Sequence, residues 1–284
     1  MSQSSKNKET LKEYGRGIIG GLLFSLPLIY TMEVWWTGFI APTGYLICCI
    51  FITFLLLLGF NTFAGMRKDS SFWEVCWDSV EEIGLAFIVS FLFLLLIRRV
   101  GFGMSLDEIA GKVIVESMVV AIGISVGTAQ LGGGGGGEEN SGMSGENEDD
   151  TSGTDDSIWK ILVLSICGAV LFASSVAPTQ EILQIAVESS NIHLLFMVIV
   201  SLLLNSVILY FSNFMGTSKI KLSTKKMILY ILVTYLAALL VSFFFLWFFG
   251  RVDGKSLYIV IAQMIVLAIP GSIGAAAGRL LIAR

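Results

Sequence analysis

Charged residues are scarce in this chain of 284 residues: only 14% are Asp, Glu, Lys or Arg, while 55% are hydrophobic. The mean hydropathy is +0.82. Such a composition offers too little polar surface to cover an apolar core in water. It excludes a soluble enzyme, a nucleic-acid-binding protein and a secreted disulfide-linked domain as descriptions of the whole chain. It predicts an integral membrane protein that contacts the lipid bilayer.

Cysteine and histidine are also few, with four cysteines and one histidine. The cysteines show neither C-x-x-C spacing nor the pattern of a disulfide framework. The chain has no H-E-x-x-H motif, no phosphate-binding Walker loop and no Ser or Cys with a plausible His partner. We therefore expect no enzymatic activity and no cofactor, and the sequence assigns no metal.

Long apolar runs are abundant, and each run of about 20 residues is long enough to cross the hydrocarbon core. They predict an all-α fold, a polytopic membrane bundle of about eight transmembrane helices. The predicted spans are 17–37, 42–62, 79–98, 106–130, 158–178, 192–213, 227–249 and 256–281.

An even number of spans places both termini on one side of the membrane. The tails and loops of that side hold 13 of the 18 Lys and Arg residues, including a cluster at Lys219, Lys221, Lys225 and Lys226. Because Lys and Arg are enriched in cytoplasmic loops, both termini are predicted to be cytoplasmic.

Residues 132–156 differ sharply from the rest of the chain. They begin with six glycines and contain eight of the 22 acidic residues but no Lys or Arg, so the remainder of the chain carries a net charge of +4. A segment of this composition buries too little apolar surface to fold. It is predicted to be a disordered, acidic, Gly-rich cytoplasmic tether, with an acidic interaction tail as the less favoured interpretation.

The segments on either side of this tether resemble each other. Polar residues match in register at offsets between 147 and 152, which chance explains less readily than Leu or Phe matches. Two parallel four-helix repeats are therefore predicted, residues 1–131 and 157–284, related by an axis along the membrane normal. Matching pairs include Thr31 and Thr179, Glu33 and Glu181, Lys68 and Lys219, Ser90 and Ser242, Arg99 and Arg251, and Ser125 and Ser272.

Several of these segments resemble a family of prokaryotic integral membrane proteins of unknown function. The resemblance spans nearly the whole chain outside the tether, and it implies an inner (plasma) membrane location. The matching residues are Glu33, Pro178, Thr179 and Glu181, whereas the family would be expected to have a second carboxylate where this chain has Gln180. The resembling segments are Phe24–Pro27, Tyr30–Gly38, Ala177–Glu181 and Pro270–Ala275.

Ionisable side chains inside membrane spans are costly, so each is a candidate functional residue. On a continuous first span, Glu33 would lie in the outer third of the membrane, and Glu181 would occupy the equivalent position. These residues, with Glu116, its repeat partner Gln263, and the hydroxyls of Thr31 and Thr179, are predicted to line one polar cavity. Pro178, Pro270 and Gly271 are predicted sites of helix breaking or gating.

Oxygen ligands of this kind suit a hard cation or a proton relay. The first hypothesis is a channel or transporter for protons, calcium or monovalent cations through the interface between the repeats. If Glu33 and Glu181 share a cavity, at least one of them should hold a proton near neutral pH. Alternatively, both lie at the outer interface as solvated anchors.

A hypothesis of a different class is a non-transport scaffold or sensor that uses the acidic tether as its contact segment. A homo-oligomer is compatible with either hypothesis.

Overall fold

The computed structural model describes residues 3–64, 71–101, 103–131, 155–215 and 224–280. The predicted tether lies outside the described residues except at its last two positions, where a helix has already begun. Two lysines of the predicted topology cluster, Lys219 and Lys221, also lie outside them.

All regular secondary structure in these ranges is helical, which confirms the prediction of an all-α membrane bundle. The helices are α1 (Gln3–Ile29), α2 (Met32–Ile40), α3 (Thr43–Ala64), α4 (Phe72–Leu96), α5 (Leu106–Leu131), α6 (Asp155–Val176), α7 (Gln180–Glu188), α8 (Asn191–Met215), α9 (Thr224–Phe248) and α10 (Leu257–Leu280).

Seven of the described helices are long and apolar enough to cross a membrane. An eighth crossing results if α1 and α2 count together, but the two are bent by 88° at their junction. The predicted first span, residues 17–37, was therefore wrong at its outer end. The membrane helix stops at Ile29, and the following residues form a separate short helix that crosses the direction of α1.

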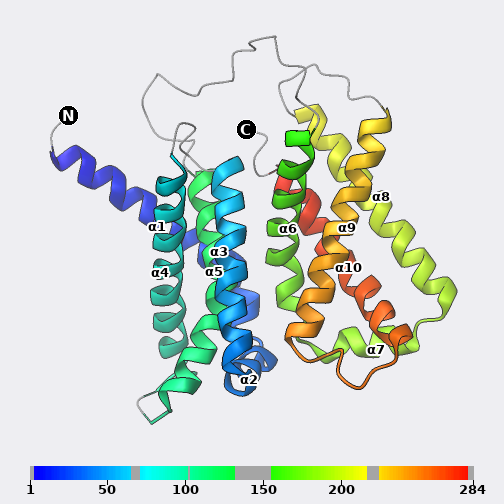
Figure 1. Cartoon of the computed structure of the whole chain (residues 1–284), viewed down its shortest axis with the longest axis horizontal. Helices are drawn as coiled ribbons and strands as arrows, with labels where there is room; N and C mark the ends of the chain where they lie inside the picture. The colour runs from blue at the N-terminus through cyan, green and yellow to red at the C-terminus, as the bar shows by residue number, and fades with distance from the viewer. Residues whose placement is uncertain (1–2, 65–70, 102, 132–154, 216–223, 281–284) are drawn as a thin grey trace.

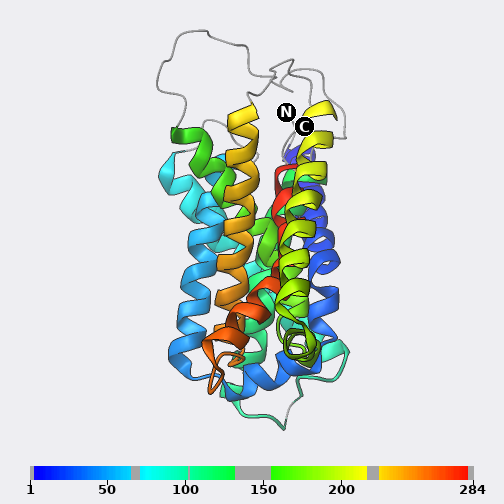
Figure 2. The same cartoon turned by 90° about the vertical axis from the view of Figure 1, so that its right-hand side faces the viewer.

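Helices α1 to α5 and α6 to α10 follow the same order: one long helix, one short helix and three long helices. Figure 1 shows the two groups side by side, with α2 and α7 at one end of the bundle. Helix α1 begins and α10 ends at the opposite end (Figure 2). This arrangement matches the order expected of two parallel repeats, whose origin by duplication remains a prediction.

Local sequence signals stop and start equivalent helices in both groups. Helix α4 is followed by Arg98, whose φ is 59°, and α9 by Gly250, whose φ is 65°. Positive φ at this position is the usual way to end a helix, and glycine adopts it without steric cost. Helices α5 and α10 each begin after a serine, Ser105 or Ser256, whose hydroxyl accepts a backbone N–H of the first turn.

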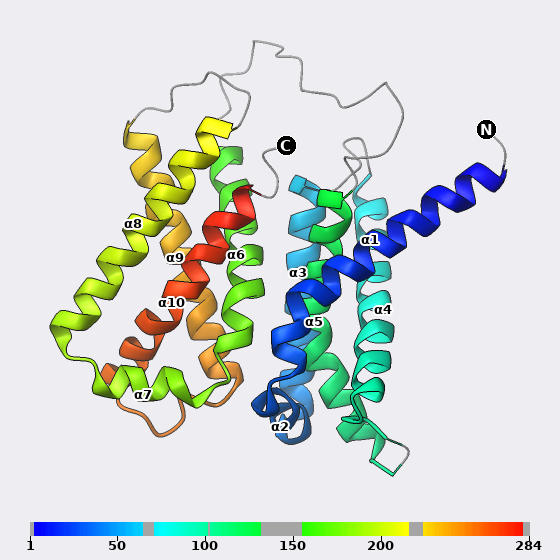
Figure 3. The same cartoon turned by 180° about the vertical axis from the view of Figure 1, so that it is seen from behind.

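The first and last helices of each group cross closely (Figure 3), and glycines lie where they meet. A Cβ added at Gly20 of α1 would lie 2.5 Å from the Cα of Gly127 in α5. A Cβ at Gly168 of α6 would lie 2.2 Å from the carbonyl oxygen of Gly274 in α10. The glycine pairs therefore pack each last span against the first span of its own group.

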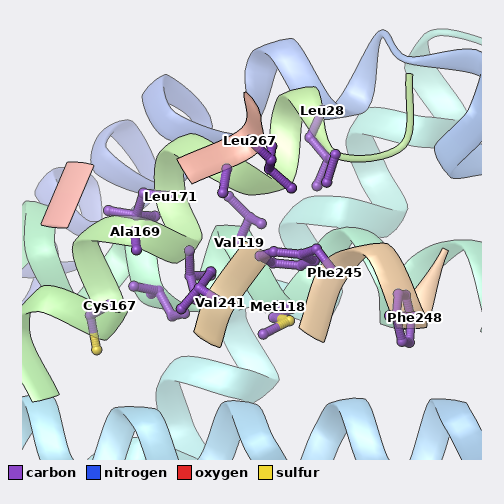
Figure 4. Close-up of a cluster of buried hydrophobic side chains, with 14 of the residues drawn as sticks. Leu28, Met118, Val119, Cys167, Ala169, Leu171, Val241, Phe245, Phe248 and Leu267 are labelled. Atoms are coloured by element: carbon purple, nitrogen blue, oxygen red, sulfur yellow. The ribbon is translucent and has the colours of Figure 1, made fainter. Parts of the chain in front are cut away.

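The two groups meet through apolar side chains. Figure 4 shows part of one buried cluster, to which α1, α5, α6, α9 and α10 contribute. A Cβ at Gly59 of α3 would lie 2.8 Å from the Val163 side chain of α6. The ring centroids of Tyr45 and Trp247 lie 4.8 Å apart in an edge-to-face contact. These contacts are what lipid-embedded helices use to associate.

Candidate functional site

The short helices α2 and α7 each follow a break in the helical backbone, and a threonine, Thr31 or Thr179, lies directly before each of them. The backbones of Thr31 and Thr179 are extended, and their hydroxyls donate backwards, to Pro27 O at 2.7 Å and to Val176 O at 2.9 Å. The Thr31 hydroxyl thus satisfies a carbonyl that the interrupted helix leaves free, whereas Val176 O accepts the backbone N–H of Thr179 as well as its hydroxyl. The two predicted site threonines therefore form the breaks themselves. Pro178, which cannot donate a backbone hydrogen bond, lies inside the second break.

Glu33 and Glu181 lie in the first turns of α2 and α7, the two short helices at the lower end of the bundle in Figure 1. Glu33 is half-buried and Glu181 is exposed. A carboxylate is favourable in a first helical turn because the free N–H groups there carry partial positive charge. The sequence suggested that both residues lie within continuous membrane helices, but each lies in a separate short helix.

The electrostatics of Glu181 favour its charged form, which agrees with the alternative of a solvated anchor for this residue. Its own backbone N–H, with a smaller contribution from the side chain of Thr179, holds the pKa of Glu181 below its ordinary value of 4.5. An exposed carboxylate with a lowered pKa is ionised at neutral pH. The charge of Arg251 acts in the same direction.

Arg251, in the connection between α9 and α10, links several of the predicted residues. Its guanidinium donates to the carbonyl oxygen of Pro178 in the second break. Partial burial lowers the pKa of Arg251, while the charges of Glu33 and Glu181 act against that shift. Its backbone oxygen accepts a long hydrogen bond of 3.5 Å from the side chain of Gln263. We had noted Arg251 only as a repeat match, because a loop arginine carries no local signal of its partners.

At the first break, a backbone carbonyl group accepts its hydrogen bond from a tryptophan instead of an arginine. The indole of Trp35 donates to the carbonyl oxygen of Ile29 at 2.8 Å, and the guanidinium of Arg99 lies 4.0 Å from the centroid of the Trp35 ring. The arginine that matches Arg251 in sequence thus contacts an aromatic ring instead of the break.

Glu116 lies apart from this group. It is fully buried in α5, and neither of its carboxylate oxygens has a hydrogen-bond partner among the described residues. Its repeat partner Gln263 is buried in α10, with its side-chain oxygen likewise unpartnered. Buried polar atoms without partners are rare in folded proteins and are often functional.

Helix α10 runs without interruption through Pro270 and Gly271. The predicted helix break at Pro270 is therefore not seen, and Gly271 packs near Ala173 and Ala238 instead. A proline inside a membrane helix is tolerated where neighbouring helices satisfy the freed carbonyl group.

A polar network between α3, α4 and α5 is the feature that sequence reasoning missed. The amide nitrogen of Asn61 donates to Glu82 at 2.9 Å and to Ser79 at 3.2 Å, and Ser125 donates to the amide oxygen of Asn61 at 2.7 Å. Glu82 lies at helical spacing along α4 with Glu74, Asp78 and Glu81. Helical spacing groups these four acids correctly along one helix, but only the neighbouring helices show that Glu82 points inward.

Comparison with protein families matches residues 13–282 to the family described as "Putative integral membrane protein (DUF2391)". The chain belongs to this family. No curated protein and no solved structure matches it.

Membership of DUF2391 covers both helical groups, so the integral membrane assignment holds for the whole bundle and agrees with its candidate spans. Large apolar side chains such as Phe51, Leu55 and Leu203 are exposed on these spans. In a membrane they contact lipid. The family description extends no further than the membrane, so any activity has to be argued from the residues.

Proposed function

We propose that this protein moves a cation, with the proton as the first candidate, across the inner membrane of a prokaryotic cell. Its role is non-enzymatic, and its termini face the cytoplasm. The groups that carry the ion are Glu116 and the network around Glu82, inside the first helical group.

The observation that carries this proposal is the buried, unpartnered carboxyl group of Glu116. Placing a charged side chain at the centre of a membrane helix costs about 3 kcal/mol on insertion scales. Such a group is stable only when it holds a proton, binds a cation or is reached by water, and each of these states is a step in ion movement.

The network around Glu82 supplies a second carboxylate on the same route. Ser125, which belongs to that network, and Glu116 are nine residues apart on α5, so they are separated by roughly 14 Å along its axis. That spacing is too large for direct transfer and needs a chain of about four water molecules, since hydrogen-bonded oxygens lie about 2.8 Å apart. Amide and hydroxyl groups beside Glu82 are suitable ligands for a hard cation or a hydrated proton.

A route between the two helical groups, with Glu33 and Glu181 as relay groups, has less support. The close contacts between the groups at Gly59 and Tyr45 are made by apolar and aromatic side chains. Arg251 also places a positive charge near both glutamates, and this charge repels an incoming cation. We therefore assign Glu33 and Glu181 to the surface at the helix breaks.

Reconstituted liposomes test the proposal. An imposed pH gradient, or a gradient of calcium or a monovalent cation, should collapse faster with the wild-type protein than in empty liposomes. Glu116→Gln and Glu82→Gln should each return the rate towards that of empty liposomes. Glu188→Gln, which removes an exposed carboxylate of α7, is the matched control and should keep the wild-type rate, as should the double variant Glu33→Gln/Glu181→Gln.

The scaffold or sensor hypothesis gives the opposite pattern. Deleting residues 132–154 should leave ion flux intact in a transporter but abolish partner binding in a scaffold. Wild-type flux no faster than in empty liposomes for every ion would refute the transport proposal. Loss of flux only in the Glu33→Gln/Glu181→Gln variant would move the route to the boundary between the helical groups.

A further inference from the structure

A basic pocket opens beside the first helix break, at the end of the bundle where α4 turns into α5. Its volume is about 330 Å³, and it is lined by Trp35, Trp36, Phe39, Arg98, Arg99, Met104, Glu108 and Lys112. Three cationic side chains and one acid therefore face the same space. The flux proposal uses none of these residues.

The charges of the pocket are unequally satisfied. Lys112 is largely buried and pairs with Glu108 at 2.6 Å, and it also donates to the backbone oxygen of Arg99 at 3.1 Å. The only acid of the pocket is thus already engaged. Arg98 and Arg99 are both exposed, and neither forms an ion pair within the described part of the chain. The pocket consequently has a net positive charge. Its Arg98 guanidinium has no ion-pair partner among the described residues, and its Arg99 guanidinium lies over the Trp35 ring, which leaves the N–H groups at its edge for a ligand.

Arg98 is also held in an unfavourable backbone conformation. Its φ of 59° lies in the left-handed region, where the equivalent residue of the second group is Gly250. A side chain other than glycine is destabilised there because its Cβ comes too close to the following carbonyl oxygen. A strained residue within a pocket is a reason to examine it for function.

The pocket lies at the boundary of the membrane. The candidate spans Phe72–Leu96 and Leu106–Ala129 end and begin next to it. Trp36 and Phe39 are exposed on α2, and aromatic side chains of this kind are enriched at the level of the lipid headgroups. A ligand that reaches the guanidinium groups from the bilayer would have an anionic head and an apolar tail.

We propose that this pocket binds a phosphate group, supplied by the headgroup of an anionic phospholipid in that leaflet. Paired guanidinium groups match the oxygens of a phosphate with several charge-assisted hydrogen bonds. Trp36 and Phe39 pack against the acyl chains or glycerol of the same lipid. The second helical group has no equivalent pocket chemistry, since Gly250 replaces Arg98 and the guanidinium of Arg251 is bonded to Pro178.

The test uses the full-length protein in a neutral detergent. Short-chain phosphatidylglycerol, short-chain phosphatidylcholine and inorganic phosphate are titrated separately while thermal unfolding is followed. We expect phosphatidylglycerol to raise the unfolding temperature more than phosphatidylcholine does. Arg98→Gly should weaken this binding about tenfold, the loss of one hydrogen bond between charged groups.

Arg98→Gly is informative because glycine relieves the strained backbone, so the variant should be folded and at least as stable as the wild type without ligand. Lys255→Ala removes one exposed positive charge from the same end of the bundle and should leave binding unchanged. If inorganic phosphate binds and depends on Arg98 while phosphatidylglycerol does not, the phosphate site stands with a soluble source. Equal losses in Arg98→Gly and Lys255→Ala, or no preference for either phosphate ligand over phosphatidylcholine, would overturn the proposal.

Discussion

At the scale of single residues, the same side-chain type has different roles according to which helix receives it. Glu181 is an exposed carboxylate that favours the start of a short helix, whereas Glu116 is a buried carboxyl group with no partner among the described residues. Hydropathy alone does not distinguish the two glutamates, since each lies within or at the edge of an apolar run. Their surroundings therefore lead to opposite expectations for protonation, and Glu181 offers the cleaner test.

The pH dependence of stability should show the role of Glu181. Because folding lowers its pKa, the charged form stabilises the folded state above the ordinary value of about 4.5, and this contribution is lost as pH falls below that value. In detergent, the unfolding temperature of Glu181→Gln should lie slightly below that of the wild type at pH 7, and the two should converge under acid. Glu188→Gln serves as the comparison and should keep the acid-dependent decrease of the wild type. A constant difference at all pH values would contradict the assignment.

At the scale of elements, close glycine contacts decide which helices pair. Gly20→Ala would place a methyl group 2.5 Å from the Cα of Gly127 and 2.6 Å from the carbonyl oxygen of Gly123. Backbone atoms cannot move aside as side chains do, so α1 and α5 must separate, at a cost of about 1–3 kcal/mol. The unfolding temperature should fall by several degrees. Gly84→Ala, which has nothing within 4 Å, should be neutral or slightly stabilising, and equal effects of the two substitutions would contradict the packing.

The two helix breaks, before α2 and before α7, differ in whether the sequence predicts them. The second break is marked by Pro178, and a discontinuity there was expected. The first break has no proline between Ile29 and Met32 and no glycine either; it depends on the extended backbone of Thr31 and on the indole of Trp35. Those contacts come from residues within an apolar run, where hydropathy sees only one continuous span.

At the scale of the whole molecule, the arrangement predicts which surfaces face each side of the membrane. Helix α1, which contains Lys12, begins at the end of the bundle opposite the connection between α9 and α10, which contains Lys255 (Figure 1). The prediction of eight crossings therefore puts the two lysines on opposite sides of the membrane. In a variant with all four native cysteines replaced, Lys255→Cys should react with an impermeant maleimide in intact cells. Lys12→Cys should react only after the cells are opened. Labelling of both from one side would contradict the eight crossings, and the reversed pattern would contradict the cytoplasmic termini alone.

Hydropathy alone located the membrane spans, because a run of apolar residues has to be buried in lipid whatever its neighbours are. The spacing of polar residues also predicted that the two groups correspond, but it did not predict the short helices α2 and α7. The tertiary structure alone decided that α5 packs against α1, that Glu82 points towards Asn61 and that Arg251 approaches both short helices. These facts depend on which faces of distant helices meet, and the free energy of that choice comes from shape and hydrogen bonds that no local pattern records.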